Sequence, residues 1–510
     1  MIGAYLFYGV LSLAASVYLY FKWKHSYWKR KNVDYIEPEF LFGNTGDVLK
    51  KKEHKSTLYK KYYEHFKSRG QKFGGLYDFQ RPVLMVTDLE LARNVIQKDF
   101  SHFVNHVAFL NEENDPLSGN LFNLRDEKWK NIRALLTPTF SSGKIKMMFE
   151  TMVKTTEGFE KLLDKSAKIN EPVNIGPQLL LFTTDIIASV AFGIEANCME
   201  NPDSDFRKVF TNVLGSSPLQ LIKLIIALSL PKWLLVLLKV RLADQKIGNF
   251  FTKVVTDIVE YREKNKVFRK DFMHLLIQLK NMGELEDGEN LTNSTTKKHL
   301  SIPEMTAHAV TFYVAGFETS SSTMSFVMLE LALHQDIQDR LREEIHSVIK
   351  KYDGKITYDG VMEMEYLNMV LQESMRKNSV AANLSRNCNK AYKIPGTDVV
   401  IDPDTEVIIP VLGFHWDPEY YPEPEKFDPE RFSPENKHKI PNYAYLPFGD
   451  GPRSCIGLRF GKIQSLLGIC FIVSKYRITL NNKTQLPVEL DLSKRIPAVR
   501  GGVWLDLEKL

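Results

Sequence analysis

The stretch Phe448–Gly457, which reads FGDGPRSCIG, decides the fold of this chain. Its glycines and proline favour a tight turn and keep any helix or strand from running through it. The turn presents Cys455, with the cation of Arg453 two residues before it. From Leu458 onward apolar residues recur at helical spacing, so we expect a helix to begin directly after the turn.

The thiol of Cys455 therefore lies just before a predicted helix N-terminus. Free backbone N–H groups and the positive end of the helix dipole stabilise a thiolate there, so we expect a lowered thiol pKa. A thiolate that a turn holds open on one side suits an axial ligand to haem iron, where it favours O–O cleavage. The alternative for a single cysteine is a small buried hydrophobic residue.

The whole stretch resembles the haem-ligand loop of the cytochrome P-450 family, Phe-Gly-x-Gly-x-Arg-x-Cys-x-Gly, at every fixed position. The resemblance extends from about residue 26 to the C-terminus and is strongest to insect microsomal members. It implies haem b, with Cys455 as the axial thiolate and metal ligand. It also implies a mainly α fold with small β-sheets, the cytochrome P-450 fold, as one catalytic domain over residues 26–510.

Composition and charge exclude several other classes. The chain has 510 residues, and its net charge of +5 is small for that length and does not indicate nucleic-acid binding. Four widely spaced cysteines form no CxxC pair, which argues against a disulfide framework or a structural zinc site. His102 and His106 stand four apart, but no nearby acid completes a metalloprotease motif, and solvated or hydrogen-bonded histidines are the commoner case.

The first residues predict a membrane anchor. Residues 2–21 carry no charge, and twenty helical residues span roughly 30 Å, about the thickness of the hydrocarbon core. A cleaved signal peptide is the weaker alternative, since the basic n-region is missing. Five cations precede the first acid and predict that the bulk of the chain faces the cytosol: Lys22, Lys24, Lys29, Arg30 and Lys31. We therefore assign residues 1–25 to a single transmembrane helix, expected in the endoplasmic reticulum.

A second apolar segment covers residues 218–240 and is interrupted by Pro231. Each half is too short to span a bilayer, and a buried core helix is one interpretation. Trp233 stands beside lysines, which suits a membrane interface. The resemblance implies a second, monotopic membrane contact here, through which an apolar substrate enters.

A helix beginning near Lys128 places Trp129 and Arg133 on one face, four residues apart. An indole N–H and a guanidinium suit a carboxylate, although a surface packing pair is the alternative. The resemblance implies that both side chains hold a haem propionate. It implies the same role for Arg386 and for Arg453.

A long helix is predicted from about Pro303 to Leu333, capped by Ser301. Its interior reads Ala315-Gly316-Phe317-Glu318-Thr319, and the glycine costs about 1 kcal/mol against alanine, which close approach of a flat cofactor would explain. The Thr319 hydroxyl can bond the carbonyl four residues earlier. Helix packing is the alternative. The resemblance implies that Glu318 and Thr319 are catalytic and supply protons for O–O cleavage.

Glu373 and Arg376 stand three apart on another predicted helix. The resemblance implies that this pair is buried, holds Arg431, and supports the cysteine loop without taking part in chemistry. One departure follows directly. Family members usually continue Arg-x-Tyr-Pro-Pro, whereas this chain reads Arg376-Lys377-Asn378-Ser379-Val380, so the rigid turn toward a substrate-contacting segment is in doubt.

The resemblance implies a membrane-bound monooxygenase that hydroxylates or epoxidises apolar small molecules with dioxygen and electrons from NADPH. The implied partners are NADPH–cytochrome P-450 reductase, with cytochrome b5 as a further candidate, membrane lipid and an apolar substrate. Two alternatives stay open. One is a haem-thiolate isomerase or dehydratase, which the intact Glu318-Thr319 pair disfavours. The other is a non-catalytic haem-binding carrier or sensor, for which the missing prolines are the only hint.

Overall fold

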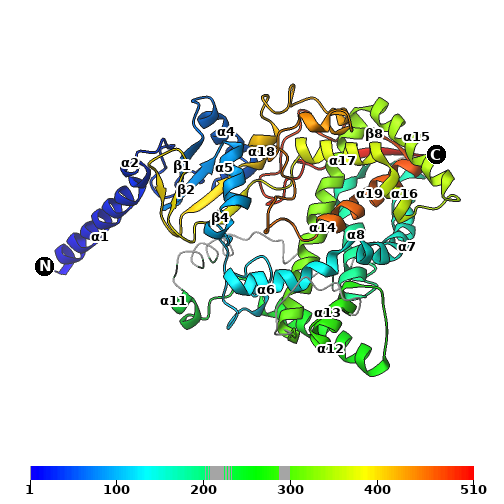
Figure 1. The fold of residues 1–510 in the computed structure, drawn as a ribbon, viewed down its shortest axis with the longest axis horizontal. Helices are drawn as coiled ribbons and strands as arrows, with labels where there is room; N and C mark the ends of the chain where they lie inside the picture. The colour runs from blue at the N-terminus through cyan, green and yellow to red at the C-terminus, as the bar shows by residue number, and fades with distance from the viewer. Residues whose placement is uncertain are drawn as a thin grey trace. The chain divides into compact units, whose positions relative to one another are not determined.

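The computed structural model describes residues 2–169, 171–201, 203, 204, 206, 223, 227, 230, 232–285 and 299–510. The chain forms two compact units, and we describe each by itself (Figure 1). Unit 1 comprises Met1–Val107, Ala381–Glu425 and Lys439–Ser454, whereas unit 2 comprises Ala108–Val380, Lys426–His438 and Cys455–Leu510. The predicted cysteine loop thus contributes Arg453 to unit 1 and Cys455 to unit 2.

Unit 1 is built on a four-stranded sheet in the order β1-β2-β7-β4. β1 and β2 form an antiparallel hairpin, β2 runs parallel to β7, and β4 runs antiparallel to β7 with Arg386 opposite Val407. The apolar run Pro82–Val86 lies within β2, and α5 follows it along the chain. The helices of unit 1 are α1 (Ile2–His25), α2 (Tyr27–Arg30), α3 (Gly46–Leu49), α4 (Lys55–Lys67), α5 (Leu89–Arg93) and α18 (Val411–His415), with short turns η1 (Asn94–Lys98) and η2 (Phe100–His102); its strands are β1 (Phe73–Asp78), β2 (Arg81–Val86), β4 (Leu384–Asn387), β5 (Tyr392–Lys393), β6 (Val400–Ile401) and β7 (Glu406–Ile409).

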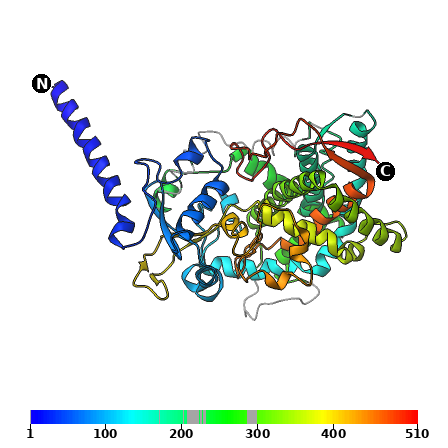
Figure 2. The same cartoon turned by 90° about the horizontal axis from the view of Figure 1, so that it is seen from above.

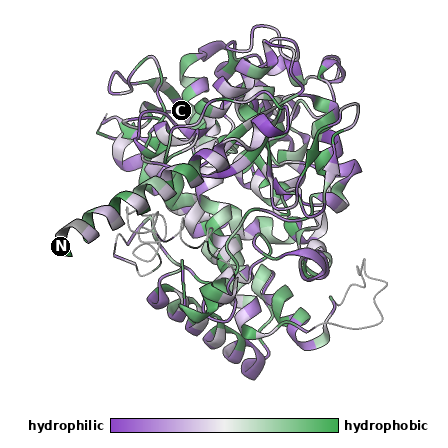
Figure 3. Ribbon diagram, turned by 90° about the vertical axis from the view of Figure 1, so that its left-hand side faces the viewer, coloured by the Kyte–Doolittle hydropathy of each residue, from purple (hydrophilic) through white to green (hydrophobic). Residues whose placement is uncertain are grey.

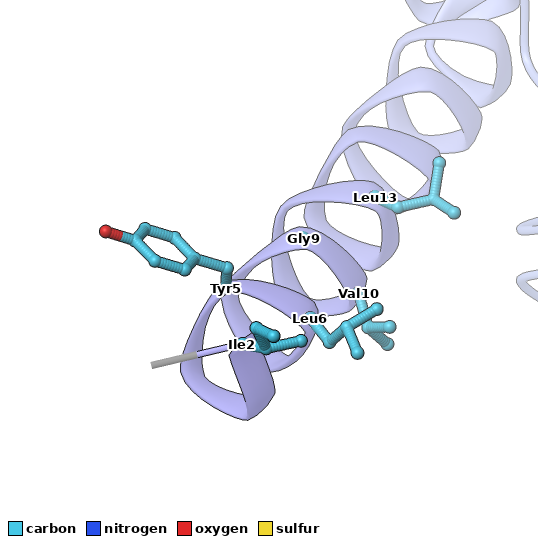
Figure 4. A pocket seen from close by; sticks show the side chains of 6 residues that line it. All are labelled: Ile2, Tyr5, Leu6, Gly9, Val10 and Leu13. Atoms are coloured by element: carbon cyan, nitrogen blue, oxygen red, sulfur yellow. The ribbon is translucent and has the colours of Figure 1, made fainter.

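Helix α1 begins unit 1 and extends away from the sheet (Figures 1 and 2). Residues Tyr5–His25 are long and apolar enough to cross a membrane, and none of the most apolar window is buried within the protein. Near its start the helix presents an apolar surface lined by Ile2, Tyr5, Leu6, Gly9, Val10 and Leu13 (Figure 4). Figure 3, coloured by hydropathy, shows green, hydrophobic segments along this helix beside the N-terminal label.

Unit 2 is mainly helical, and α14 lies at its centre. This helix packs against α8 and α19, while α17 also contacts it. A three-stranded sheet in the order β3-β9-β8 completes the unit. Its helices are α6 (Asp126–Leu136), α7 (Ser142–Ala167), α8 (Ile175–Ile187), α11 (Lys232–Leu237), α12 (Gln245–Asn265), α13 (Phe272–Met282), α14 (Ile302–Leu333), α15 (Gln335–Lys351), α16 (Tyr358–Glu363), α17 (Glu365–Lys377) and α19 (Leu458–Lys475), with short turns η3 (Pro116–Ser118), η4 (Thr137–Phe140), η5 (Ala188–Phe192) and η6 (Pro429–Phe432); its strands are β3 (Val173–Asn174), β8 (Tyr476–Leu480) and β9 (Trp504–Lys509).

The central helix α14 begins as its sequence predicts. The Ser301 side chain accepts a hydrogen bond from the Glu304 backbone N–H, and the Glu304 carboxylate accepts one from the Ser301 N–H at 3.0 Å. This reciprocal capping box satisfies two backbone donors that a helix start leaves open. Pro303 lies in the first turn, where its missing N–H costs nothing.

The predicted Glu373–Arg376 pair is confirmed as a buried cluster in unit 2. Two hydrogen bonds of 2.8 Å join the guanidinium to the carboxylate, and neither side chain is exposed. Arg431 of η6 lies 3.5 Å from Glu373, and the Asp428 N–H donates to the same carboxylate. Burial raises the pKa of Glu373, and Arg376 opposes this rise. The cluster therefore fastens α17 to the segment that carries η6.

The turn after α17 is held in a different way from the one that a Pro-Pro pair provides. Lys377 Nζ lies 3.1 Å from Glu330 of α14, and the Asn378 side-chain amide donates to the same carboxylate at 2.9 Å. Glu330 is buried, so its charge needs these partners. Polar contacts to the central helix thus take the place of the two prolines in fixing this turn.

We predict that Glu373→Ala destabilises the protein by roughly 3–5 kcal/mol, because it leaves the Arg376 charge buried without a partner. Urea unfolding of purified protein measures the change. The matched control is Arg477→Ala, which removes an exposed guanidinium 3.6 Å from Asp339 and should cost less than about 1 kcal/mol. Equal stability of the two variants would contradict a supporting role for the cluster.

Candidate functional site

The glycines of the cysteine loop adopt the backbone conformations that the sequence predicts for a tight turn. Gly449 and Gly451 have φ of +68° and +70°, a region that side chains disfavour. A Cβ on Gly451 would also lie 2.0 Å from the carbonyl oxygen of Ile96, so the chain passes too close for any other residue. Helix α19 then begins at Leu458 with Gly457 as its cap residue. The predicted arrangement of a turn followed by a helix is confirmed.

The side chains of the four cysteines differ in exposure. Cys198, Cys388 and Cys470 are fully buried, whereas Cys455 is exposed. The open thiol is the one that the loop presents. This agrees with a ligand role for Cys455 and with the buried, hydrophobic role for the other three.

The electrostatics of Cys455 differ from the expectation. Although the side chain is open to solvent on one side, the protein packed around the sulfur raises its pKa, while the Gly457 backbone N–H and the positive charge of Arg133 lower it. The expected lowering of the pKa is therefore wrong for the protein alone, since desolvation outweighs the helix start. Arg133 is the cation that acts on this thiol, although the sequence pointed to Arg453. A bound metal ion would remove the thiol proton outright.

Helix α6 carries Trp129 and Arg133 on one face, as predicted. The Trp129 indole is buried, and burial also lowers the pKa of Arg133, an effect that Cys455 opposes. Arg133 thus places a desolvated cation within reach of the thiol. Such a cation suits a thiolate or a carboxylate of a ligand.

Arg386 and Arg453, the two candidate propionate-binding arginines in unit 1, are also buried. Arg386 on β4 donates from one terminal nitrogen to the Ser385 carbonyl at 2.9 Å, but its Nε has no hydrogen-bond partner among the described residues. Burial lowers the pKa of Arg386 to about 10. The Nε of Arg453 donates to the Val104 carbonyl at 2.8 Å. A buried arginine with an open donor is costly unless an anionic group comes to it.

The interior of α14 shows the predicted hydroxyl bond. Thr319 Oγ donates to the Ala315 carbonyl at 2.6 Å. Ala315 is exposed and Thr319 is partly exposed, although more than half of the residues of this central helix are buried. The helix therefore presents a small residue and a hydroxyl to an open space. Glu318 is half-buried beside them, and burial raises its pKa.

The need for a glycine at position 316 is explained by helix packing, whereas from the sequence we expected the close approach of a flat cofactor. A Cβ on Gly316 would lie 2.5 Å from the end of the Ile187 side chain on α8. The glycine thus permits close packing of two helices, and the close approach of a flat cofactor is not needed to explain it. The Gly316 carbonyl also accepts a hydrogen bond from Gln464 of α19 at 3.3 Å.

His102 and His106, which stand four residues apart in the sequence, do not share a helix. His102 ends the short turn η2, and His106 lies in the irregular segment after it. Within the described ranges no group of three or more histidine, cysteine or acidic side chains is placed to hold a metal ion. His308 on α14 is buried.

Sequence reasoning missed two sets of residues. Glu330 stands in the apolar run Phe326–Leu333, and a single acid in such a run was a signal for a buried, paired carboxylate. Lys494 and Arg495, whose charges act on Glu318, lie 176 and 177 residues after it, and nothing local marks them. Both sets depend on contacts between distant parts of the chain.

The residues present fit a haem group. Cys455 offers an exposed sulfur, and Arg386 offers an unpaired buried donor for a propionate. Trp129, Arg133 and Arg453 add further donors of the kind that carboxylates prefer. Their placement is described within each unit, with Cys455, Trp129 and Arg133 in unit 2 and the other two arginines in unit 1.

Comparison with known proteins agrees with this assignment. The family described as Cytochrome P450 matches residues 37–498. The chain is similar to Cytochrome P450 6a2 of Drosophila melanogaster, with 40% identity over 99% of both chains. It is also similar to Cytochrome P450 6A1 of Musca domestica, with 36% identity over 100% of this chain and 98% of that relative.

We predict that Cys455→Ala abolishes the red-shifted Soret band of the reduced carbon monoxide complex, because the thiolate that causes the shift is lost. The spectrum of purified protein reconstituted with haem measures this. Cys388→Ala is the matched control and should keep the band, since that thiol is fully buried. A band that survives at Cys455→Ala would assign the ligand elsewhere.

Proposed function

The chain belongs to the cytochrome P450 family, and from that premise we propose that it is a membrane-bound enzyme that oxidises apolar small molecules with electrons from NADPH. Family membership makes it a haem-thiolate monooxygenase, an oxidoreductase whose cofactor is haem with iron and an axial cysteine thiolate. The proposal adds the membrane, the electron donor and the substrate class. Its products are hydroxylated or epoxidised compounds.

We assign Cys455 as the axial ligand. Haem with a thiolate ligand supplies the activation of dioxygen and the cleavage of its O–O bond. The protein holds the Cys455 sulfur in a fixed position. It does so through Gly449 and Gly451, whose φ angles are positive, and through the start of α19. Arg133 adds a positive charge that stabilises the thiolate.

Four side chains are assigned to the propionates. A propionate carboxylate matches the fork of an arginine and the N–H of an indole. Arg386 supports this best, because its buried Nε lacks a partner among the described residues. Trp129, Arg133 and Arg453 complete the set.

The observation that carries the proposed reaction is the state of α14 around Thr319. Its hydroxyl is bonded to the Ala315 carbonyl, next to an exposed alanine on a central helix, with the Glu318 carboxyl one residue away. A carboxyl whose pKa is raised by burial carries a proton nearer to neutral pH than an exposed one, as a proton donor requires. We therefore assign Glu318 and Thr319 to proton delivery.

This assignment bears on the two alternatives. An isomerase or dehydratase needs no protons for O–O cleavage and has no use for the acid–alcohol pair. A carrier or sensor was suggested only by the missing prolines, and the contacts of Lys377 and Asn378 with Glu330 replace what those prolines do. Monooxygenation is the function that accounts for both observations.

Helix α1 supports membrane attachment. It is continuous with unit 1, since Tyr77 donates to the His25 carbonyl at 2.6 Å and the buried Trp28 indole donates to the Leu76 carbonyl at 2.8 Å. The cations that follow the apolar residues favour the cytosolic face of the endoplasmic reticulum. An enzyme in that place takes electrons from NADPH–cytochrome P-450 reductase, and cytochrome b5 is a second candidate donor.

The second membrane contact was predicted at residues 218–240, most of whose first half lies outside the described residues. In the described part, Trp233, Leu237 and Leu238 are exposed, with lysines on either side. Leu235 is instead buried against Phe109 and Ala227. We propose that the three exposed side chains form the membrane contact.

We predict that Thr319→Ala keeps haem and substrate binding but diverts NADPH electrons to peroxide or water, because the hydroxyl no longer passes protons. Product, NADPH and peroxide are measured together with purified reductase and a panel of apolar substrates. Thr323→Ala is the control, since that hydroxyl makes the same kind of bond one turn later, to the Thr319 carbonyl. Unchanged yield of product per NADPH in Thr319→Ala would make Thr319 a packing residue.

We predict that deleting residues 1–25 weakens membrane binding and leaves the haem spectrum intact, while residual binding to liposomes resists high salt. Adding Trp233→Glu and Leu237→Glu should release the protein, because charge at an apolar contact is costly to desolvate. Flotation of phosphatidylcholine liposomes measures both steps. Full release by the deletion alone, or loss of haem in either variant, would contradict the two-contact arrangement.

A further inference from the structure

A hairpin near the C-terminus approaches the acid of α14. Residues 489–500 form it, with Leu490 opposite Val499 in antiparallel pairing and the Asp491 N–H donating to the Ala498 carbonyl at 2.8 Å. We call this segment the 489–500 hairpin. Lys494 and Arg495 stand at its tip, and both are exposed.

One hydrogen bond fixes the position of the hairpin along the axis of α14. Ser322 Oγ donates to the Pro497 carbonyl at 2.5 Å. Ser322 follows Glu318 by four residues, so the two side chains are neighbours on one face of the helix. The hairpin therefore contacts α14 one turn from Glu318, at a position two residues after Arg495.

The charges at this point agree with the geometry. Burial raises the pKa of Glu318, and the positive charges of Lys494 and Arg495 lower it. They are the charged side chains whose field acts on Glu318 in the part of the chain that the structure describes. Asp491 is an acid of the same hairpin; burial raises its pKa, while hydrogen bonds from Ser493 and the charges of Lys494 and Arg500 lower it.

We propose that Lys494 and Arg495 are positioning residues for Glu318, which the 489–500 hairpin brings to α14 so that the carboxyl can release its proton and be protonated again. The proposal rests on the proposed proton-delivery role of Glu318. When the carboxyl gives its proton toward Thr319, a carboxylate remains in a half-buried place. The two cations stabilise that carboxylate, and a proton from solvent then restores the acid.

This role differs from that of two solvated surface charges at a loop tip. Surface charges would leave the ionisation of Glu318 unaffected, and the Ser322 bond would then serve packing alone. The difference can be measured on Glu318 itself, without turnover. It can also be measured as the share of NADPH electrons that is released as peroxide and does not reach the product.

The test uses the full-length haem-loaded protein with its reductase and the double variant Lys494→Gln/Arg495→Gln. Infrared difference titration against Glu318→Gln reports the pH at which the Glu318 carboxyl loses its proton. Because the cations lower that pKa, their removal should move the midpoint to higher pH. The share of NADPH electrons released as peroxide should rise several-fold.

Three companion variants keep the result specific. Lys494→Arg/Arg495→Lys should restore both readouts, since it keeps the charges. Arg500→Gln, on the same hairpin but paired with exposed Glu489 at 2.8 Å, should change neither. Ser322→Ala, which releases the tip from α14, should move the midpoint in the same direction as the double variant.

The outcomes that overturn the proposal are equally clear. An unmoved midpoint in the double variant shows that the tip charges do not act on Glu318. An equal rise in peroxide when the double variant is made in the Glu318→Gln background shows that they act by another route. If Glu318→Gln alone leaves the peroxide share unchanged, proton delivery by Glu318 is wrong, while the infrared midpoint still decides the hairpin assignment.

Discussion

The negative charge on one sulfur is the constraint on which the rest of this structure depends. Burial makes a thiolate at Cys455 costly, as its raised pKa records, and the protein opposes that cost with the Gly457 N–H and the Arg133 guanidinium. The turn must also hold the sulfur still while keeping one side of it open to solvent. This requires a glycine at Gly451, where no Cβ fits against the Ile96 carbonyl. Iron and haem would complete the compensation that these groups begin.

Helix α14 shows how the environment assigns different roles to two carboxylates on one element. Glu330 is buried, and its carboxylate contacts Lys377 and Asn378, which holds the turn after α17. Glu318, about three turns earlier on the helix, is acted on by the charges of Lys494 and Arg495. We therefore assign a structural role to Glu330, which contacts Lys377 and Asn378 directly, and proton exchange to Glu318. The missing prolines thus change how the turn after α17 is fixed. They do not change Glu318 and Thr319.

Local rules account for what the sequence predicted well. The glycine turn, the start of α19, the capping box of Ser301 and the Thr319 bond to Ala315 all join residues within five positions of each other. The Glu373–Arg376 pair is also local, but its burial was predicted from the family resemblance. Tertiary contacts account for the rest: the contact of Gly316 with Ile187, the partners of Glu330 and the approach of the 489–500 hairpin connect residues separated by long stretches of chain. The predicted direction of the Cys455 pKa shift was wrong. The sequence shows the helix start, which lowers the pKa, but it does not show the desolvation, which depends on the packed structure.

The central claim is that this chain inserts one oxygen atom of dioxygen into an apolar molecule. Its most direct test is turnover of apolar hydrocarbons by the full-length protein and reductase under ¹⁸O₂ in ordinary water, with mass spectrometry of the product. The account predicts that the hydroxylated product carries one ¹⁸O atom and that the second appears as water. A product whose oxygen comes from water, or an isomerised product with no added oxygen, would contradict it.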